Sequence, residues 1–195
     1  MATKTLIPRI LCIAERSYCA SFQDWFTRCL ELQELLVSFP TLGLQIRNKT
    51  TDADSELEKL LPEITPSPQI WLNGIIETTK VFQRHISEYQ IKQSRQYPVF
   101  ASSIHSPEAL DKAISFAPKF LQYGAVFATS KPVQPLGISR LQRICDLSSV
   151  PILAVGGIDS KEKIIECTKA GADGVSIGSW IMQAKNMKER IEDIL

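Results

Sequence analysis

The sequence predicts one compact (β/α)₈ barrel of the TIM type over residues 1–195, on three observations. Eight short apolar runs with β character alternate along the chain with amphipathic stretches of helical spacing. No low-complexity tract or long polar linker divides the chain, and its 44% hydrophobic content is enough for a sizeable core. Strands that alternate with helices are typical of a parallel sheet, and eight such pairs close into a barrel.

The strand candidates are apolar runs that end in polar or glycine-containing turns. They are 9–14, 43–47, 69–73, 84–87, 99–104, 120–127, 151–156 and 174–178. The section from 75 to 96 must hold a third helix and the fourth strand–helix unit in few residues, with only short apolar runs to mark them.

The helix candidates show apolar residues at helical spacing and recognisable end signals. They are 21–38, 52–61, 106–116, 138–147, 160–169 and 186–194. Ser21 is an expected N-cap, Pro107 follows Ser106 as the first helical residue, and Gly171 ends the fifth candidate. A doubly wound open sheet is the alternative fold, but the first strand turn lacks the G-x-G-x-x-G fingerprint of its usual dinucleotide ligand.

Charge and cysteine content exclude several classes of function. With 22 Lys and Arg against 21 Asp and Glu, the chain has no electrostatic footprint for nucleic acid or an acidic membrane. The N-terminal apolar stretch before Glu15 is too short for a signal peptide, so we expect a cytoplasmic protein. Five cysteines without a C-x-x-C pair argue against disulfides and zinc, and two histidines are too few for a histidine-rich metal centre.

Two glycine-containing turns follow the seventh and eighth strand candidates, at Gly156-Gly157 and Gly178-Ser179. In a barrel these loops meet at the C-terminal face, where backbone N–H groups commonly hold a phosphate. Glycine lets the backbone approach phosphate oxygens closely, and a following helix N-terminus favours an anion. The pair therefore predicts a site for a small phosphorylated molecule.

The segment 99–194 resembles the thiamine phosphate synthases and their relatives, the TenI-type thiazole tautomerases. The motifs are "SSIHSPEAL", "YGAVFATSKPVQPLGISRL", "VPILAVGGI" and "AGADGVSIGSWI", in the family's order. The N-terminal half matches more thinly, through "LQIRNK", "IWLNG" and "HISEYQ". The resemblance implies a transferase of thiamine biosynthesis that joins thiazole phosphate to an aminopyrimidine pyrophosphate.

The resemblance also assigns site residues. Gly157, Ser179 and Thr129 would hold the phosphate of the thiazole phosphate or of the thiamine phosphate product. A second group would surround the pyrophosphate of the other substrate: Arg47, Lys49, Asn73, Ser103 and Lys131. Among these, the three cations Arg47, Lys49 and Lys131 are the expected catalytic residues, since departure of pyrophosphate develops negative charge.

Three departures from the family pattern concern catalysis. The family's Mg²⁺ is held by carboxylates after the third strand and in the fourth unit, where this chain has Gly74 and Gln90, so no metal ligand is expected there. Glu88 is a candidate substitute. The tautomerases' histidine before V-F is Ala125 here, and the loop at Thr129 to Lys131 is shortened.

Three functions therefore stay open: a synthase with altered metal binding, a TenI-like tautomerase, and a non-catalytic binding protein for phosphorylated ligands. The sequence also leaves the oligomeric state open, a homodimer included.

Overall fold

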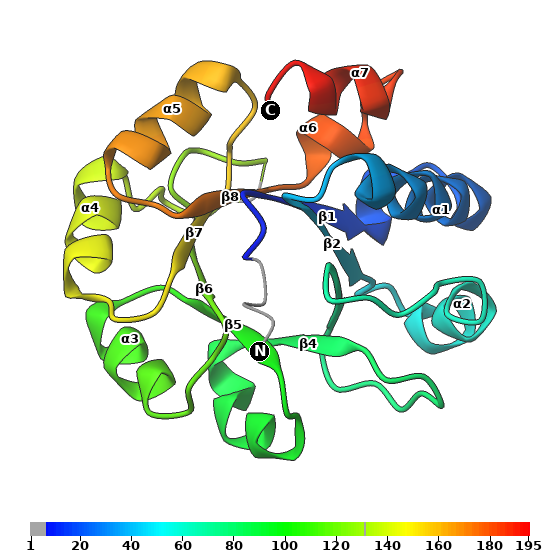
Figure 1. The fold of residues 1–195 in the computed structure, drawn as a ribbon, viewed down its shortest axis with the longest axis horizontal. Coiled ribbons are helices and arrows are strands. Elements are labelled where there is room, and N and C mark those ends of the chain that lie inside the picture. The colour runs from blue at the N-terminus through cyan, green and yellow to red at the C-terminus, as the bar shows by residue number, and fades with distance from the viewer. Residues whose placement is uncertain (1–6, 131) are drawn as a thin grey trace.

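The computed structural model describes residues 7–130 and 132–195, and its eight parallel strands form a closed barrel in sequence order with helices outside (Figure 1). This confirms the predicted (β/α)₈ barrel, and the open-sheet alternative is wrong. The strands are β1 Ile10–Glu15, β2 Leu42–Arg47, β3 Ile70–Asn73, β4 Gln83–Ile86, β5 Phe100–Ile104, β6 Leu121–Gly124, β7 Ile152–Val155 and β8 Gly174–Ile177. The barrel closes where Ile10 of β1 pairs with Val175 of β8.

The helices occupy the outer ring, where the six predicted helices are joined by a short helix, α6, that the sequence did not predict. They are α1 Phe22–Ser38, α2 Ala53–Leu60, α3 Pro107–Ile114, α4 Ile138–Leu147, α5 Lys161–Lys169, α6 Ser179–Met182 and α7 Met187–Glu192, with the 3-10 helices η1 Arg16–Tyr18 and η2 Glu88–Gln96. Ser21 caps α1 by accepting the Asp24 N–H at 3.1 Å, and Ser106 caps α3 by accepting the Ala109 N–H at 3.2 Å. The end signals in the sequence thus set these boundaries.

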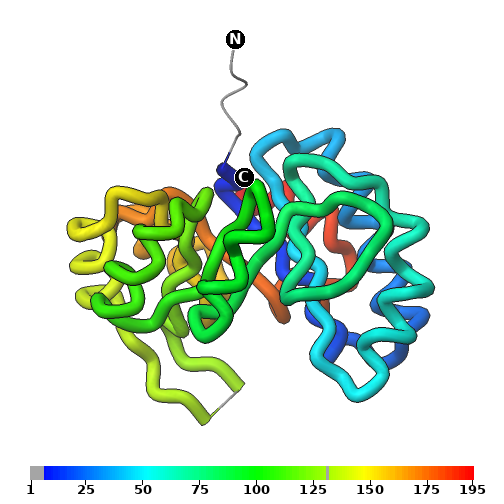
Figure 2. Tube along the Cα trace, turned by 90° about the horizontal axis from the view of Figure 1, so that it is seen from below, coloured from blue at the N-terminus to red at the C-terminus, as the bar shows by residue number. Residues whose placement is uncertain are grey.

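The sixth strand is shorter than predicted. The apolar run extends to residue 127, but β6 ends at Gly124. After it the chain folds back on itself, because Ala125 and Val126 accept the backbone N–H groups of Leu136 and Gly137 at 2.8 and 3.0 Å. Figure 2 shows this loop, in yellow-green, projecting from the barrel face opposite the dark blue start of β1.

The section between β3 and β5 also differs from expectation, since residues 74–82 contain no helix. The Arg84 guanidinium donates to the Ile76 carbonyl at 2.8 Å, and Lys80 Nζ donates to the Ile64 carbonyl at 2.9 Å. Such contacts give this loop the hydrogen bonds that a helix would have made internally. In the fourth strand–helix unit, the 3-10 helix η2 takes the place of an α-helix after β4.

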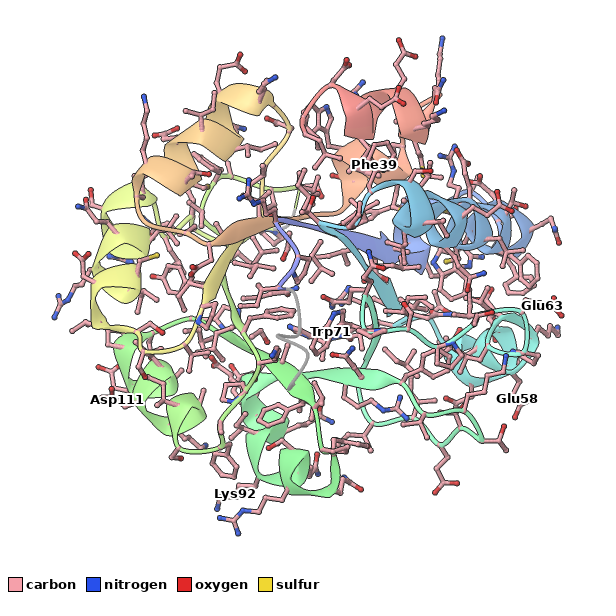
Figure 3. The ribbon with its side chains drawn as sticks, in the orientation of Figure 1. Phe39, Glu58, Glu63, Trp71, Lys92 and Asp111 are labelled. Carbon is pink, nitrogen blue, oxygen red and sulfur yellow. The ribbon has the colours of Figure 1, made fainter. Side chains whose placement is uncertain are left out.

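Side chains alternate along the strands between a helix-facing core and the barrel interior. The interior cluster at the N-terminal end consists of Leu11, Trp71, Ala101, Phe120 and Leu153. Trp71 lies at the centre of the barrel in Figure 3, and its ring meets Phe120 edge to face with centroids 4.8 Å apart. This apolar plug closes the barrel below the polar residues described next.

All five cysteines are free, and burial raises the pKa of Cys12 to about 12. Buried thiols of this kind act as small apolar core residues. Within residues 7–130 and 132–195, no helix combines the length and the apolar character needed to cross a membrane.

Candidate active site

The predicted site residues lie at or beyond the C-terminal ends of the strands. Arg47 and Asn73 are the last residues of β2 and β3, and Ser103 is the penultimate residue of β5. Thr129 and Gly157 lie in the loops after β6 and β7. Because all strands of a parallel barrel point the same way, these residues share one face.

Of the three remaining predicted residues, the structure describes two. Ser179 is exposed at the start of α6, and Lys49 is exposed two residues after β2. Lys131 lies outside the described residues.

Arg47 is paired with a carboxylate that the sequence reasoning missed. Glu15, the last residue of β1, lies directly opposite Arg47 in the strand register, and its Oε2 forms an ion pair with Arg47 Nη1. Glu15 is 2% exposed, and burial lowers the pKa of the Arg47 guanidinium. The sequence did contain a signal for this residue. Glu15 follows Leu11 by four residues on the same strand, so both side chains face the barrel interior.

Asn73 is likewise engaged, with His85 on the neighbouring strand β4. Asn73 Nδ2 lies 3.0 Å from His85 Nδ1. Burial, with smaller contributions from the positive charges of Arg47 and Lys49, lowers the pKa of His85 to about 3. The imidazole is therefore neutral, and with Nδ1 accepting from the amide its proton lies on Nε2. Nε2 is buried without a hydrogen-bond partner in the described part of the chain.

His85 belongs to a buried polar layer across the barrel. In such barrels, interior layers take one side chain from each alternate strand. Here β2, β4, β6 and β8 supply four polar residues, none more than 4% exposed: Gln45, His85, Gln122 and Ser176. Their strand neighbours, such as Leu44 and Ile46, pack against the helices instead. This layer is the polar floor of the site, above the apolar plug.

The loops after β6 and β7 pack closely against each other. Phe127 N–H donates to the Gly156 carbonyl at 3.0 Å. Gly156 and Gly157 have φ of +98° and +68°, and a Cβ on Gly157 would lie 2.2 Å from the Ala128 carbonyl oxygen. Only glycine has both the conformational freedom and the small size that Gly157 needs.

Lys163 on α5 fixes this pair of loops. Its ammonium group donates to the Gly157 carbonyl at 2.9 Å and to Asp159 Oδ1 at 2.7 Å. It also lies 5.1 Å from the centroid of the Phe127 ring, within range of a cation–π interaction. One half-buried cation therefore connects α5 with both loops.

Backbone donors at these loops are available to a ligand. Among the described residues, the N–H groups of Gly157, Ile158 and Ser179 have no acceptor. Their loops follow β7 and β8, which are neighbours in the barrel. Unused N–H groups that follow two adjacent strands are the feature expected of an anion site.

An ion pair and a histidine–carboxylate contact lie close to the rim. Arg16 Nε contacts Glu56 Oε1 at 3.0 Å, and Asn48 Nδ2 donates to Glu56 Oε2 at 2.7 Å, which ties together the loops after β1 and β2. His105 Nδ1 lies 3.0 Å from Glu88 Oε2.

The residues present do not fit the Mg²⁺ that the family resemblance implies. Gly74 offers no side-chain ligand, and the Gln90 Oε1 amide oxygen accepts the Ser87 hydroxyl at 2.9 Å. Glu88, the candidate substitute, is held by His105. No group of three or more His, Cys, Asp or Glu in the described residues is arranged to hold a metal. Magnesium prefers anionic oxygen ligands, and this donor set lacks them.

Fold and site together define a (β/α)₈ barrel with a polar C-terminal face and glycine-containing loops after β7 and β8. Comparison with known proteins identifies the family of barrels that this chain resembles. The family model described as thiamine monophosphate synthase matches residues 85–181. The chain belongs to the thiamine phosphate synthase family.

Individual relatives agree with this assignment. The thiamine-phosphate synthase of Koribacter versatilis is 28% identical in an alignment that covers 91% of this chain and 90% of that protein. The thiamine-phosphate synthase of Pyrococcus abyssi is 30% identical over 98 residues, so that match spans 49% of this chain and only 47% of the relative. The solved thiamine phosphate pyrophosphorylase from Pyrococcus furiosus is 18% identical, with a TM-score of 0.65 over 97% of this chain and 94% of its own, and shows the shared fold.

The matched segment divides the predicted site in two. It begins at His85, so Ser103, Thr129, Gly157 and Ser179 fall inside it. Arg47, Lys49 and Asn73 fall outside. The residues predicted to hold the phosphate therefore all lie in the matched segment, whereas only Ser103 and Lys131 of the predicted pyrophosphate group do.

Proposed function

We propose that the chain binds a phosphorylated thiamine precursor, or thiamine phosphate, at the loops after β7 and β8, and that its transferase activity is absent or weak. The observation that carries this proposal is the set of unused N–H groups at Gly157, Ile158 and Ser179. Phosphate oxygens accept several such donors at once, and the positive φ of Gly157 lets the backbone come close to them.

The ring of the ligand would lie toward the polar layer of Gln45, His85, Gln122 and Ser176. This layer offers unused polar atoms, His85 Nε2 and Ser176 Oγ. A heterocycle with hydrogen-bonding edges suits such a floor better than a purely apolar group, because a buried polar atom without a partner is costly.

By the family resemblance, the opposite side of the site would face the pyrophosphate of the second substrate with Arg47, Lys49, Asn73, Ser103 and Lys131, of which Lys131 lies outside the described residues. Transfer requires stabilisation of the departing pyrophosphate. Gly74 and Gln90 supply no carboxylate for a metal, so several kcal/mol of transition-state stabilisation would be missing, at about 1.4 kcal/mol for each factor of ten in rate. Binding without efficient turnover is the expected result.

The five free cysteines suit a reducing compartment, and we place the protein in the cytoplasm.

A steady-state assay with both thiamine precursors tests this function. The protein is incubated with aminopyrimidine pyrophosphate and thiazole phosphate, with and without millimolar Mg²⁺, and thiamine phosphate is quantified. We expect a turnover far below the value of ~1 s⁻¹ at the low end of ordinary enzymes, together with saturable binding of thiamine phosphate. Magnesium-dependent turnover at an ordinary rate would show an active synthase, and metal-free isomerisation of a thiazole carboxylate would show a tautomerase.

A further inference from the structure

The mouth of the barrel contains a buried ion pair that links two strand ends. Glu15 and Arg47 are the last residues of β1 and β2 and are partners in the register of these strands. Glu15 Oε2 pairs with Arg47 Nη1, while Glu15 Oε1 accepts the Ser17 backbone N–H at 3.5 Å. The Glu15 side chain is 3% exposed and that of Arg47 is 21% exposed. Solvent therefore screens this pair less than it would a surface pair.

This pair lowers the positive charge that Arg47 presents to an anion in the site. An arginine without a counter-ion would offer a full positive charge and a fork of donors to a phosphoryl group. Here the adjacent carboxylate cancels that charge. β1 lies between β8 and β2 in the barrel, so Glu15 also separates the loop after β8 from Arg47.

Among the described residues, the groups next to Arg47 do not replace the lost positive charge. His85 is neutral, since its pKa lies well below the physiological range. Asn73 is engaged with His85. Lys49 is exposed to solvent, where its attraction for an anion is screened. A second phosphoryl group beside Arg47 would thus gain little and would approach a buried carboxylate.

We propose that Glu15, by holding Arg47, makes this site select phosphate monoesters over pyrophosphates. This inference rests on the proposed function and narrows its substrate class. It makes Glu15 a specificity-determining residue, one that acts on the ligand through Arg47.

Calorimetric titrations of inorganic phosphate and inorganic pyrophosphate, each in the presence of a metal chelator, test this inference. The wild-type chain should bind pyrophosphate no more tightly than phosphate. Glu15→Gln should tighten pyrophosphate binding about tenfold or more, while phosphate affinity changes little, because Arg47 is released for a charge-assisted contact. Asp24→Asn is the matched control, since it frees Arg28 from an ion pair of 2.9 Å on α1 and should leave both affinities unchanged.

The double variant Glu15→Gln with Arg47→Gln covers the case in which Glu15→Gln alone fails to fold. It replaces the ion pair by a neutral amide pair of similar size. If Glu15 already neutralises Arg47 in the wild type, the double variant should bind pyrophosphate with the affinity of the wild type. A tenfold loss in the double variant, an unchanged anion preference in folded Glu15→Gln, or wild-type preference for pyrophosphate would each overturn the proposal. Failure of the proposed function would look different, because wild type would then bind neither thiamine phosphate nor inorganic phosphate.

Discussion

Gln122 donates a hydrogen bond from its Nε2 to Oε1 of Gln45 across the barrel interior, at 2.7 Å. The two residues come from β6 and β2 and are separated by 77 positions in the chain. Both are almost fully buried, so each amide depends on the other for a partner. This contact joins opposite walls of the barrel at the level where a ligand would rest.

The first prediction concerns the energy of this contact. Gln122→Leu should lower the free energy of unfolding by about 1–3 kcal/mol, because it leaves the Gln45 amide oxygen buried without a donor. Urea unfolding measures the change. The double variant with Gln45→Leu should lose less than the sum of the two single variants, and exposed Gln93→Leu should change stability by less than about 0.5 kcal/mol. Additive losses would mean that the two amides are not coupled.

The second prediction is a pH dependence set by His85. Its pKa is about 3 in the fold against 6.5 for an ordinary histidine, so the unfolded chain binds the proton first as the pH falls. Stability should therefore decrease as the pH drops from about 6.5 toward 3, by up to about 1.4 kcal/mol per pH unit from this group.

Urea unfolding at several pH values between 5 and 7 tests this dependence. His85→Gln should flatten the slope in that window, whereas exposed His105→Gln should retain it. If the wild type and His85→Gln gave parallel curves, the histidine would be solvated or protonated in the fold.

The third prediction concerns Lys163 as a positioning residue for the Gly157 loop. Lys163→Met removes the donor to the Gly157 carbonyl and the contact with Phe127. We expect thiamine phosphate affinity to fall roughly threefold to tenfold, as for the loss of one hydrogen bond. Calorimetry provides the measurement, and Lys163→Arg should recover part of the affinity.

The matched control is Lys188→Met on α7, which removes an exposed lysine lying 3.8 Å from Glu192 at the same spacing of four residues. Its affinity should equal that of the wild type. Equal losses in the two variants would indicate a general effect of charge, and no loss in Lys163→Met would leave the loop positioned by other contacts.

The fourth prediction concerns magnesium. Combining Gly74→Asp with Gln90→Asp should raise magnesium-dependent formation of thiamine phosphate above that of the wild type, provided that both carboxylates reach the pyrophosphate. Gly74 has φ of +92°, so an aspartate there should also cost about 1 kcal/mol of stability. Gly74→Asp alone, with the amide of Gln90 retained, is the control. A wild-type chain that already responds strongly to Mg²⁺ would contradict the interpretation of these positions.

The sequence predicted the barrel well because local signals and topology agree along most of the chain. Ser21, Ser106 and Ser160 cap the helices that follow them, each through its own side-chain oxygen. Periodicity failed where tertiary contacts decide the structure. Residues 125–127 read as strand but turn into a loop closed by Leu136 and Gly137, and the section after β3 takes its hydrogen bonds from side chains such as Arg84.

For the site, the sequence predicted positions but not partners. Arg47 and Asn73 end their strands as expected, because strand ends follow from the pattern. Their engagement with Glu15 and His85 depends on the register between neighbouring strands, which no local pattern specifies. The polar layer was missed for the same reason, since its four members lie on four alternate strands and come together only when the barrel closes.

Calorimetric titration of thiamine phosphate into Gly157→Leu tests most directly the claim that the loops after β7 and β8 hold a phosphate ester. A side chain at Gly157 would meet the Ala128 carbonyl oxygen in a backbone conformation with φ of +68°, so the loop should shift and its N–H groups should lose their alignment. Gly171→Leu is the control, because Gly171 also has positive φ, at +95°, but lies between α5 and β8 at the other end of the barrel. We predict that Gly157→Leu, shown to be folded by cooperative urea unfolding, binds thiamine phosphate at least about tenfold more weakly than the wild type, whereas Gly171→Leu binds it as the wild type does. Unchanged affinity in folded Gly157→Leu would contradict the account and place the phosphate elsewhere on the barrel.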